Sequence, residues 1–257
     1  MRVSLCQLNI QYEEKIKNIR SVERFVSEAS EVGSDIVFFP EMTFTGFSMN
    51  ISFTCDKNNE SIDAVSNYAE KYGIAIGFGW VKKDGEKAEN HYTVVSPKRK
   101  ILADYIKIHP FSYSGEDKYF SGGTRLSSFD YCGKTIGICI CYDLRFPEIF
   151  QALSKKAEVI VVAANWPKRR SDQWTKLLDA RAIENQAWIF GVNCFGVQNG
   201  LEYSGNSRIV KPVGELCCKI DDVEGLITCE INDEATDFRK EFPVKNDRRI
   251  ELYRDIL

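Results

Sequence analysis

Three residues that together suit attack on an amide each stand at the end of an apolar segment. Cys141 follows the segment IGICI, Glu41 follows IVFFP and Lys107 follows ILADYI. A thiol attacks an amide when a base removes its proton and nearby donors stabilise the tetrahedral oxyanion. The three side chains therefore predict a nucleophile, a base and an oxyanion partner.

Each of these residues has an expected step in such a reaction. Glu41 is expected to be the base toward Cys141 and, once protonated, the acid toward the leaving nitrogen. Lys107 adds a positive charge that favours the thiolate and faces the oxyanion. The backbone N–H of Tyr142, directly after the nucleophile at a strand-to-helix turn, is the expected second donor. Loss of one such donor costs about 3 kcal/mol of transition-state stabilisation, so Lys107 is expected to be indispensable.

Two other interpretations of these residues stay open at this point. The chain has two histidines, so a dyad of Cys141 with His109 is the alternative to catalysis by Glu41. Cysteine is also among the most buried residue types, and a lone cysteine is more often part of a core than a nucleophile. Cys139 is predicted to be such a small core residue.

The hydrophobic periodicity alternates between strand and helix from the first residues to about residue 231, which is typical of a layered α/β fold. We expect a single domain, 1–257, whose charged segment from about residue 233 covers the surface or a partner subunit. The expected strands are 3–10, 36–39, 74–81, 91–96, 101–108, 158–163 and 187–197. The expected helices are 16–29, 61–72 and 171–186. Ile16 is expected on the apolar face of the first helix, and Ser171 is expected to be the N-cap of the third.

Composition narrows the class of protein. Of the 257 residues, 44% are hydrophobic and 28% charged, which suits a globular core, and the net charge of −3 argues against a nucleic-acid surface. Lys168-Arg169-Arg170 is expected to be a solvated loop. No apolar run approaches the length of a membrane helix, and no leader follows Met1. The nine cysteines lack paired metal-ligand spacing, so we expect a reducing, cytoplasmic location with neither metal nor cofactor.

Three motifs, in this order along the chain, resemble the nitrilase superfamily of carbon-nitrogen hydrolases. They are residues 40–47 (PEMTFTGF), 107–111 (KIHPF) and 141–148 (CYDLRFPE). The resemblance implies a four-layer α-β-β-α sandwich with a Glu-Lys-Cys triad formed by Glu41, Lys107 and Cys141. It also implies a second glutamate, Glu116, that orients Lys107 and the substrate amide, and a homodimer or larger homo-oligomer. An exposed loop carboxylate is the alternative for Glu116.

Further motifs are most similar to the omega-amidase branch, which deaminates monoamides of short dicarboxylic 2-oxo acids. They are residues 41–47, 141–146, 164–167 (ANWP) and 241–243 (EFP). The resemblance implies hydrolysis of 2-oxoglutaramate or 2-oxosuccinamate through a cysteine acyl-enzyme. The alternatives are hydrolysis of N-carbamoyl amines or aliphatic amides on the same scaffold and, in a different class, a non-catalytic metabolite-binding protein.

Four residues are candidates for binding the rest of the substrate. Arg145 is expected to grip a distal carboxylate with two parallel hydrogen bonds, or else to form an ion pair with Glu148. Trp166 either walls the pocket or packs in the core, and Arg170 and Ser171 are secondary candidates. Separately, Arg181 and Glu184 stand three residues apart on a helix, which favours a packed ion pair.

Overall fold

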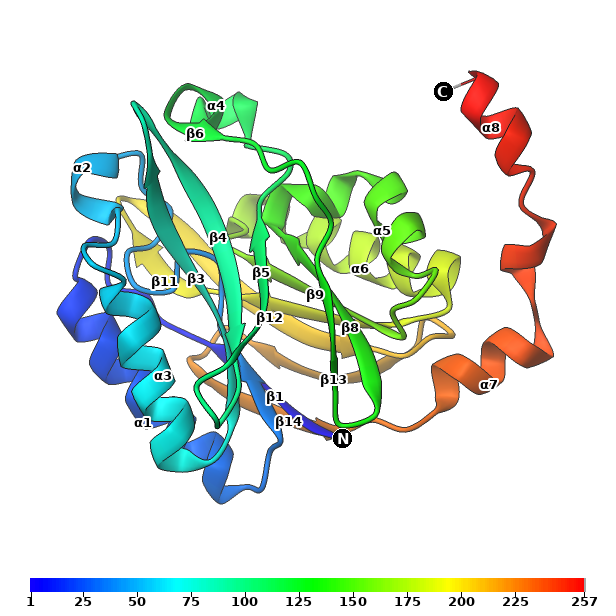
Figure 1. Cartoon of the computed structure of the whole chain (residues 1–257), viewed down its shortest axis with the longest axis horizontal. Coiled ribbons are helices and arrows are strands. Elements are labelled where there is room, and N and C mark those ends of the chain that lie inside the picture. The colour runs from blue at the N-terminus through cyan, green and yellow to red at the C-terminus, as the bar shows by residue number, and fades with distance from the viewer. Residues whose placement is uncertain (257) are drawn as a thin grey trace.

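Two sheets face each other in the computed structural model, which describes residues 1–256, and helices cover the outer face of each sheet (Figure 1). The helices α1 (Lys15–Glu31) and α3 (Glu60–Tyr72) cover the first sheet, and α5 (Pro147–Leu153) and α6 (Ser171–Asn185) cover the second. The expected four-layer α-β-β-α sandwich is therefore confirmed. No helix of the described residues is long and apolar enough to cross a membrane.

The first sheet has the strand order β14-β1-β2-β3-β4-β5, and β6 pairs with β4. The strands β1, β2 and β3 are parallel, whereas β4 runs antiparallel between β3 and β5. The bounds are β1 (Arg2–Gln7), β2 (Ile36–Phe38), β3 (Ala75–Asp84), β4 (Lys87–Val95), β5 (Ile101–Ile106), β6 (Phe120–Ser121) and β14 (Gly225–Glu230).

The second sheet has the strand order β11-β12-β10-β9-β8-β7, and β13 pairs with β12. The strands β8, β9 and β10 are parallel at its centre. The bounds are β7 (Ser128–Tyr131), β8 (Lys134–Ile140), β9 (Val159–Ala164), β10 (Trp188–Asn193), β11 (Phe195–Gln198), β12 (Leu201–Val210) and β13 (Leu216–Asp221).

Helices connect the parallel strands and extend the chain at its end. The α-helices are α1 (Lys15–Glu31), α2 (Ile51–Thr54), α3 (Glu60–Tyr72), α4 (Glu116–Tyr119), α5 (Pro147–Leu153), α6 (Ser171–Asn185), α7 (Glu234–Glu241) and α8 (Ile250–Ile256). The 3-10 turns are η1 (Ser112–Ser114), η2 (Cys141–Arg145), η3 (Lys168–Arg170) and η4 (Val244–Asp247).

The continuous apolar run of β9 shows how one strand serves two layers. Val161 faces the core between the sheets, and the next residue, Val162, faces the core under α5 and α6. Because successive side chains point to opposite faces, a strand covered on both sides has no polar position. Each fully buried Val or Ile contributes about 1.5–3 kcal/mol, so both interfaces are strongly apolar.

Two local expectations are wrong. Ile16 is 69% exposed because α1 turns other residues toward the sheet, among them Asn18, whose side chain donates to the carbonyls of Gln11 and Phe44 at 2.7 Å each. Ser171 does not cap α6: the turn η3 continues directly into the helix, so Ser171 already has helical φ and ψ, and Arg170 precedes it without a side-chain capping bond.

The segment after Asp233 extends away from the sandwich at the right of Figure 1. Its helix α7 stays attached through Arg239, which donates to the carbonyls of Gln186 and Ala157 at 2.9 and 2.8 Å. Further along, Lys245 donates to the carbonyl of Ser154 at 2.6 Å. The segment therefore runs past the ends of α5 and α6, and its expected contact with a partner subunit stays a prediction.

Candidate active site

Strand direction brings the predicted site residues to one edge of the sandwich. Glu41 follows β2, and Lys107 follows β5, which runs in the same direction as β2 because two antiparallel pairings lie between β3 and β5. In the second sheet, Cys141 and Asn165 follow the parallel neighbours β8 and β9. The carboxyl ends of parallel strands meet at one edge, so side chains far apart in sequence converge there.

The thiol of Cys141 stands on a sharp turn. Cys141 has a φ of 44°, in the left-handed region, which costs an ordinary residue about 1–2 kcal/mol. Asp143 holds this turn: its Oδ2 accepts from the backbone N–H of Ile140 at 3.0 Å and from the Tyr105 hydroxyl at 2.8 Å. Arg181 adds two bonds to the carbonyl of Leu144, at 3.1 and 2.9 Å. The turn is therefore fixed, and the thiol is half-buried at its tip.

The loop that carries Glu41 lies directly against β3. A Cβ at Gly79 would collide with the backbone nitrogen of Met42, so only glycine allows this approach. The hydroxyl of Thr43 accepts from the backbone N–H of Gly79 at 2.9 Å and donates to the carbonyl of Pro40 at 2.6 Å. These contacts fix the backbone of Glu41, whose side chain is completely buried.

Lys107 lies between two buried carboxylates. Its Nζ donates to Glu41 Oε1 at 2.8 Å and to Glu116 Oε1 and Oε2 at 3.1 and 2.9 Å. Glu116 is completely buried and also accepts from the backbone N–H of Phe111 at 2.5 Å. The expectation that Glu116 lies beside Lys107 agrees with this geometry, and the alternative of an exposed carboxylate does not.

Burial and charge set the protonation states of this group. Burial opposes the charge of Lys107, but Glu116 and Glu41 outweigh burial and raise its pKa above the usual value, so the ammonium is kept. Burial raises the pKa of the Cys141 thiol well above its ordinary value, Glu41 and Glu116 raise it further, and Lys107 opposes them. Lys107 therefore favours the thiolate of Cys141, as expected, but burial and the two carboxylates outweigh it and favour the protonated thiol.

Two asparagines that the sequence analysis did not single out orient Glu41. Asn90 in β4 donates to Glu41 Oε1 at 2.8 Å, and the backbone N–H of Asn165 donates to Glu41 Oε2 at 3.0 Å. Asn165 stands next to Trp166 in a motif that was noticed, whereas Asn90 carried no signal. Both carboxylate oxygens of Glu41 are thus held in place.

His109 is engaged elsewhere. Its Nδ1 lies 2.9 Å from Asp143 Oδ1, and its ring stacks on Phe146 with centroids 3.7 Å apart. It is not among the described residues that line the cavity in front of Cys141. The geometry therefore supports the interpretation through Glu41 rather than the Cys141–His109 dyad.

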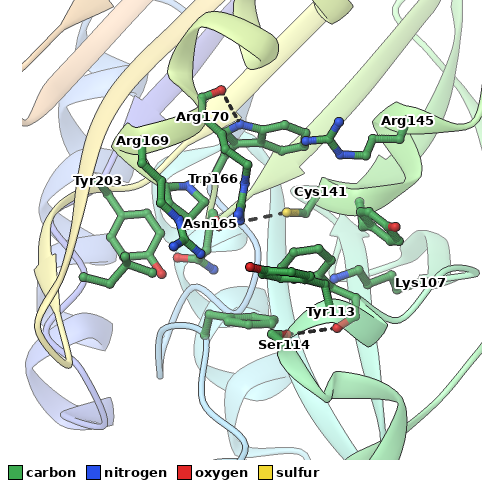
Figure 2. Close-up of a pocket in the computed structure, with 15 residues that line it drawn as sticks. Lys107, Tyr113, Ser114, Cys141, Arg145, Asn165, Trp166, Arg169, Arg170 and Tyr203 are labelled. Carbon is green, nitrogen blue, oxygen red and sulfur yellow. Dashed lines mark hydrogen bonds between the residues drawn. The ribbon is translucent and has the colours of Figure 1, made fainter.

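A cavity of about 170 Å³ opens in front of Cys141 (Figure 2). Its volume is close to the ~150 Å³ of a cavity that holds one benzene, so it suits a small molecule. Arg145, Trp166 and Arg170 line it as expected, but Ser171 does not. The remaining lining residues are Phe47, Lys107, Phe111, Tyr113, Ser114, Cys141, Tyr142, Asn165, Pro167, Arg169, Leu201 and Tyr203.

Three guanidinium groups meet at this cavity (Figure 2). Arg145 lies 4.9 Å from the centre of the Trp166 ring and donates to Gln173 at 2.6 Å. Arg170 lies 5.2 Å from the centre of the Phe111 ring. Within residues 1–256, no carboxylate forms a salt bridge with Arg145, Arg169 or Arg170, so the alternative Arg145–Glu148 ion pair is wrong.

The charges of these arginines repel one another. Burial lowers the pKa of Arg170, and the neighbouring Arg169 and Arg145 lower it further. Of the basic run at 168–170, only Lys168 is paired at the surface, 3.2 Å from Glu202. The expectation of a solvated loop agrees with the exposure of Lys168 and Arg169, but it is wrong for Arg170, which is only half-exposed and lines the cavity together with Arg169.

Comparison with known proteins assigns the family. The model of the family described as "Carbon-nitrogen hydrolase" matches residues 2–240. The chain therefore belongs to the carbon-nitrogen hydrolases of the nitrilase superfamily, and it is an enzyme of the amidase type. The interpretation as a non-catalytic protein is set aside.

Individual relatives cover nearly the whole chain. A 2-oxoglutaramate amidase of Bacillus subtilis is 33% identical over 98% of both chains, and the omega-amidase YafV of Yersinia enterocolitica is 30% identical over 96% of both. The crystal structure of XC1258 from Xanthomonas campestris, a CN-hydrolase superfamily protein with an arsenic adduct in its active site, superposes with a TM-score of 0.91. It is 26% identical and covers 96% of this chain and 97% of its own.

Proposed function

We propose that the chain hydrolyses the terminal amide of a small monoamide that carries a distal carboxylate, with 2-oxoglutaramate or 2-oxosuccinamate as the expected substrate. The observation that carries the proposal is a thiol beside a buried Glu–Lys–Glu network, at the bottom of a cavity lined by three arginines without carboxylate partners. The names of the relatives from Bacillus subtilis and Yersinia enterocolitica agree with it.

In the proposed acylation, Glu41 takes the proton of the Cys141 thiol as the sulfur bonds to the amide carbon. The carbonyl electrons move to oxygen, and Lys107 and the backbone N–H of Tyr142 stabilise the negative charge. The C–N bond then breaks while Glu41 returns the proton to the nitrogen, which leaves as ammonia. The raised pKa of the thiol is the reason that this step calls for a general base.

In the proposed deacylation, water takes the place of ammonia. Glu41 removes a proton from water, the hydroxide bonds to the thioester carbon, and the same donors stabilise the second oxyanion. Collapse of this intermediate breaks the C–S bond, and the sulfur regains its proton from Glu41. Glu116 is proposed to keep Lys107 in position through both halves.

The three arginines are proposed to hold the distal carboxylate. An anion at this position relieves the mutual repulsion of Arg145, Arg169 and Arg170. Binding energy from that remote group positions the amide carbon against Cys141 and is therefore expected to raise turnover as well as affinity. Trp166, Phe111 and Tyr113 are proposed to enclose the short carbon chain.

An ammonia-release assay tests this function. The panel is 2-oxoglutaramate, 2-oxosuccinamate, the neutral amide butyramide and an N-carbamoyl amine, each at equal concentration. The expected result is the highest kcat/KM with the two anionic monoamides, and acylated Cys141 in the mass spectrum of a quenched reaction. A higher kcat/KM with butyramide or the carbamoyl amine would overturn the proposed substrate, and an adduct on another cysteine would overturn the mechanism.

We also propose that the enzyme works without a cofactor, in the cytoplasm, as a homo-oligomer. The chemistry above requires no group beyond these side chains, and all nine cysteines are free, which suits a reducing compartment. The exposed apolar residues Phe242 and Ile250, on the segment that leaves the sandwich, are the expected subunit contacts. Light scattering on the wild-type chain and on Phe242→Ser is the corresponding measurement, with a smaller mass expected for the variant.

A further inference from the structure

A second group of thiols lies away from the catalytic cavity. The Sγ atoms of Cys217, Cys218 and Cys229 all lie within 4.8 Å of one another, and those of Cys217 and Cys229 are 3.1 Å apart. Cys229 pairs with Val3 at the start of β1, whereas Glu41 follows the far end of β2. The cluster is therefore near the opposite edge of the sheets, and the catalytic steps described above do not use it.

An irregularity of β13 explains how neighbouring residues contribute to one cluster. Successive side chains of a regular strand point to opposite faces. Here Ile209 of β12 pairs with Cys218, but the next residue, Val210, pairs with Leu216, so Cys217 is the additional residue of a β-bulge. The bulge allows the thiols of Cys217 and Cys218 to point toward Cys229 together.

The cluster also joins the two sheets. Cys217 and Cys218 belong to β13 of the second sheet, and Cys229 belongs to β14 of the first. All three residues pack against the margin of the core between the sheets, yet each is only partly buried. A ligand that binds all three is thus accessible from solvent and links β13 to β14, whose chain connection, residues 222–224, lies at the other end of both strands.

We propose that Cys217, Cys218 and Cys229 form a binding site for a thiophilic metal cation, Cu⁺ or Zn²⁺, that clamps this edge of the sandwich. Soft thiolate ligands select these ions, and three convergent sulfurs supply three ligands, with solvent completing the coordination of Zn²⁺. Each thiol that coordinates releases its proton to solvent. A disulfide accounts for two of the sulfurs and leaves the third without a role, whereas a cation uses all three.

The test is a titration of the full-length chain with Cd²⁺ as the thiolate probe. The Cys141→Ala variant is used in every metal titration, because the active-site thiol would otherwise compete for the ion. Under reducing conditions we expect one equivalent of Cd²⁺ to give the ultraviolet charge-transfer band of metal thiolates, and only a large excess of Zn²⁺ to decrease it, because thiolates bind the softer Cd²⁺ more tightly. Zn²⁺ is also expected to raise the melting temperature.

Substitutions in the same background identify the ligands. Cys217→Ser, Cys218→Ser and Cys229→Ser are each expected to weaken Cd²⁺ binding at least as much as the ~10–100-fold that loss of a residue supporting a ligand costs. Cys132→Ser is the matched control, because Cys132 is exposed and lies outside the cluster, and it should bind normally. In the chain that keeps Cys141, Cys229→Ser should retain amide hydrolysis, which shows that it folds.

Two results would overturn the proposal. One is Cd²⁺ binding that survives Cys229→Ser, since the ion would then sit elsewhere. The other is a reduced chain that does not bind Cd²⁺. A Cys217–Cys229 disulfide in the air-oxidised chain would then show that the cluster is a redox pair. Neither result depends on which amide the enzyme hydrolyses.

Discussion

Asn165 donates hydrogen bonds to both the side chain and the backbone carbonyl of Glu41. The backbone N–H of Asn165 donates to Glu41 Oε2 at 3.0 Å, and Nδ2 of Asn165 donates to the Glu41 carbonyl at 2.6 Å. Asn165 follows β9 in one sheet and Glu41 follows β2 in the other, so this pair joins the two halves of the site. The position of Glu41, the proposed base, thus depends on how the sheets pack together.

The first prediction concerns this link. Asn165→Ala leaves the buried Glu41 carbonyl without a donor, which costs about 1–3 kcal/mol, so we expect a lower melting temperature and a loss of about 10–100-fold in kcat/KM. Ammonia release and thermal unfolding measure the two effects. Asn246→Ala, at an exposed asparagine, should change neither. Normal turnover by Asn165→Ala would show that Glu41 keeps its position without this bond.

The second prediction separates the two candidate bases. Glu41→Gln keeps the shape of the side chain but cannot accept the thiol proton, so a loss of about 10²–10⁴-fold in kcat is expected. His109→Ala should retain most activity, because His109 contacts Asp143 and Phe146 rather than the cavity. A larger loss in His109→Ala than in Glu41→Gln would restore the Cys141–His109 dyad.

The same assay tests the oxyanion partner. Lys107→Met should lose about 10²–10³-fold in kcat, since the oxyanion then keeps only the backbone N–H as donor.

The meeting of Glu41, Lys107 and Cys141 was predictable because each ends an apolar strand, and strand ends of one direction share an edge. The contact of Asn90 with Glu41 was not predictable from the sequence. The two residues are 49 positions apart, and they meet only because of the register in which β4 pairs with β3 and β5. A lone asparagine in an alternating strand does not carry that information.

The direction in which the basic side chains of residues 168–170 point was likewise not predictable from the sequence. The run 168–170 looked solvated because a basic tripeptide gives no sign of direction, and only the turn η3 determines which of its side chains enter the cavity. Likewise, Ser171 is of the residue type that caps helices, but a preceding 3-10 turn removed the need for a cap. Local residue type predicted the elements well and their junctions poorly.

The third prediction concerns the thiol pKa. After burial, the carboxylate of Glu41 is the largest influence that raises the pKa of Cys141, and Lys107 opposes it. Glu41→Gln removes that negative charge and keeps Lys107, so the pKa of Cys141 should fall and thiolate should appear at lower pH, although hydrolysis is lost. Thiolate ultraviolet absorbance against pH, as a difference from Cys141→Ser in each background, measures it. A titration curve that is unmoved or moves to higher pH contradicts this electrostatic account.

The fourth prediction tests Glu116 as a positioning residue. Glu116→Ala removes one of the two carboxylates that hold Lys107 and leaves the N–H of Phe111 without its acceptor. We expect slower acylation with the amide substrate, while alkylation of Cys141 by iodoacetamide proceeds at least as fast as in the wild type. Glu116→Gln should recover part of the loss, because its amide oxygen still accepts from Lys107. Unchanged single-turnover acylation in Glu116→Ala would remove this role.

The last prediction tests whether the arginines of the cavity bind the distal carboxylate of the substrate. The guanidinium of Arg145 is held over Trp166 and by Gln173, so it presents a fixed pair of donors that the single ammonium of lysine cannot reproduce. A hydrogen bond to a charged group is worth about 1.5–3 kcal/mol, so Arg145→Lys should lower kcat/KM for 2-oxoglutaramate by about 10–100-fold. With butyramide, which lacks the carboxylate, the same variant should stay within about threefold of the wild type, since less than 1 kcal/mol is then at stake.

Two comparisons make that result specific. Arg170→Gln should show the same selectivity for the charged substrate, because Arg170 faces the same cavity, and Arg125→Gln, at an exposed arginine outside the cavity, should show none. Equal losses on both substrates would mean that Arg145 only supports the turn after Cys141. A selective loss would mean that the arginines of the cavity recognise the anionic end of the substrate. The positive charges of these arginines repel one another when no substrate is bound.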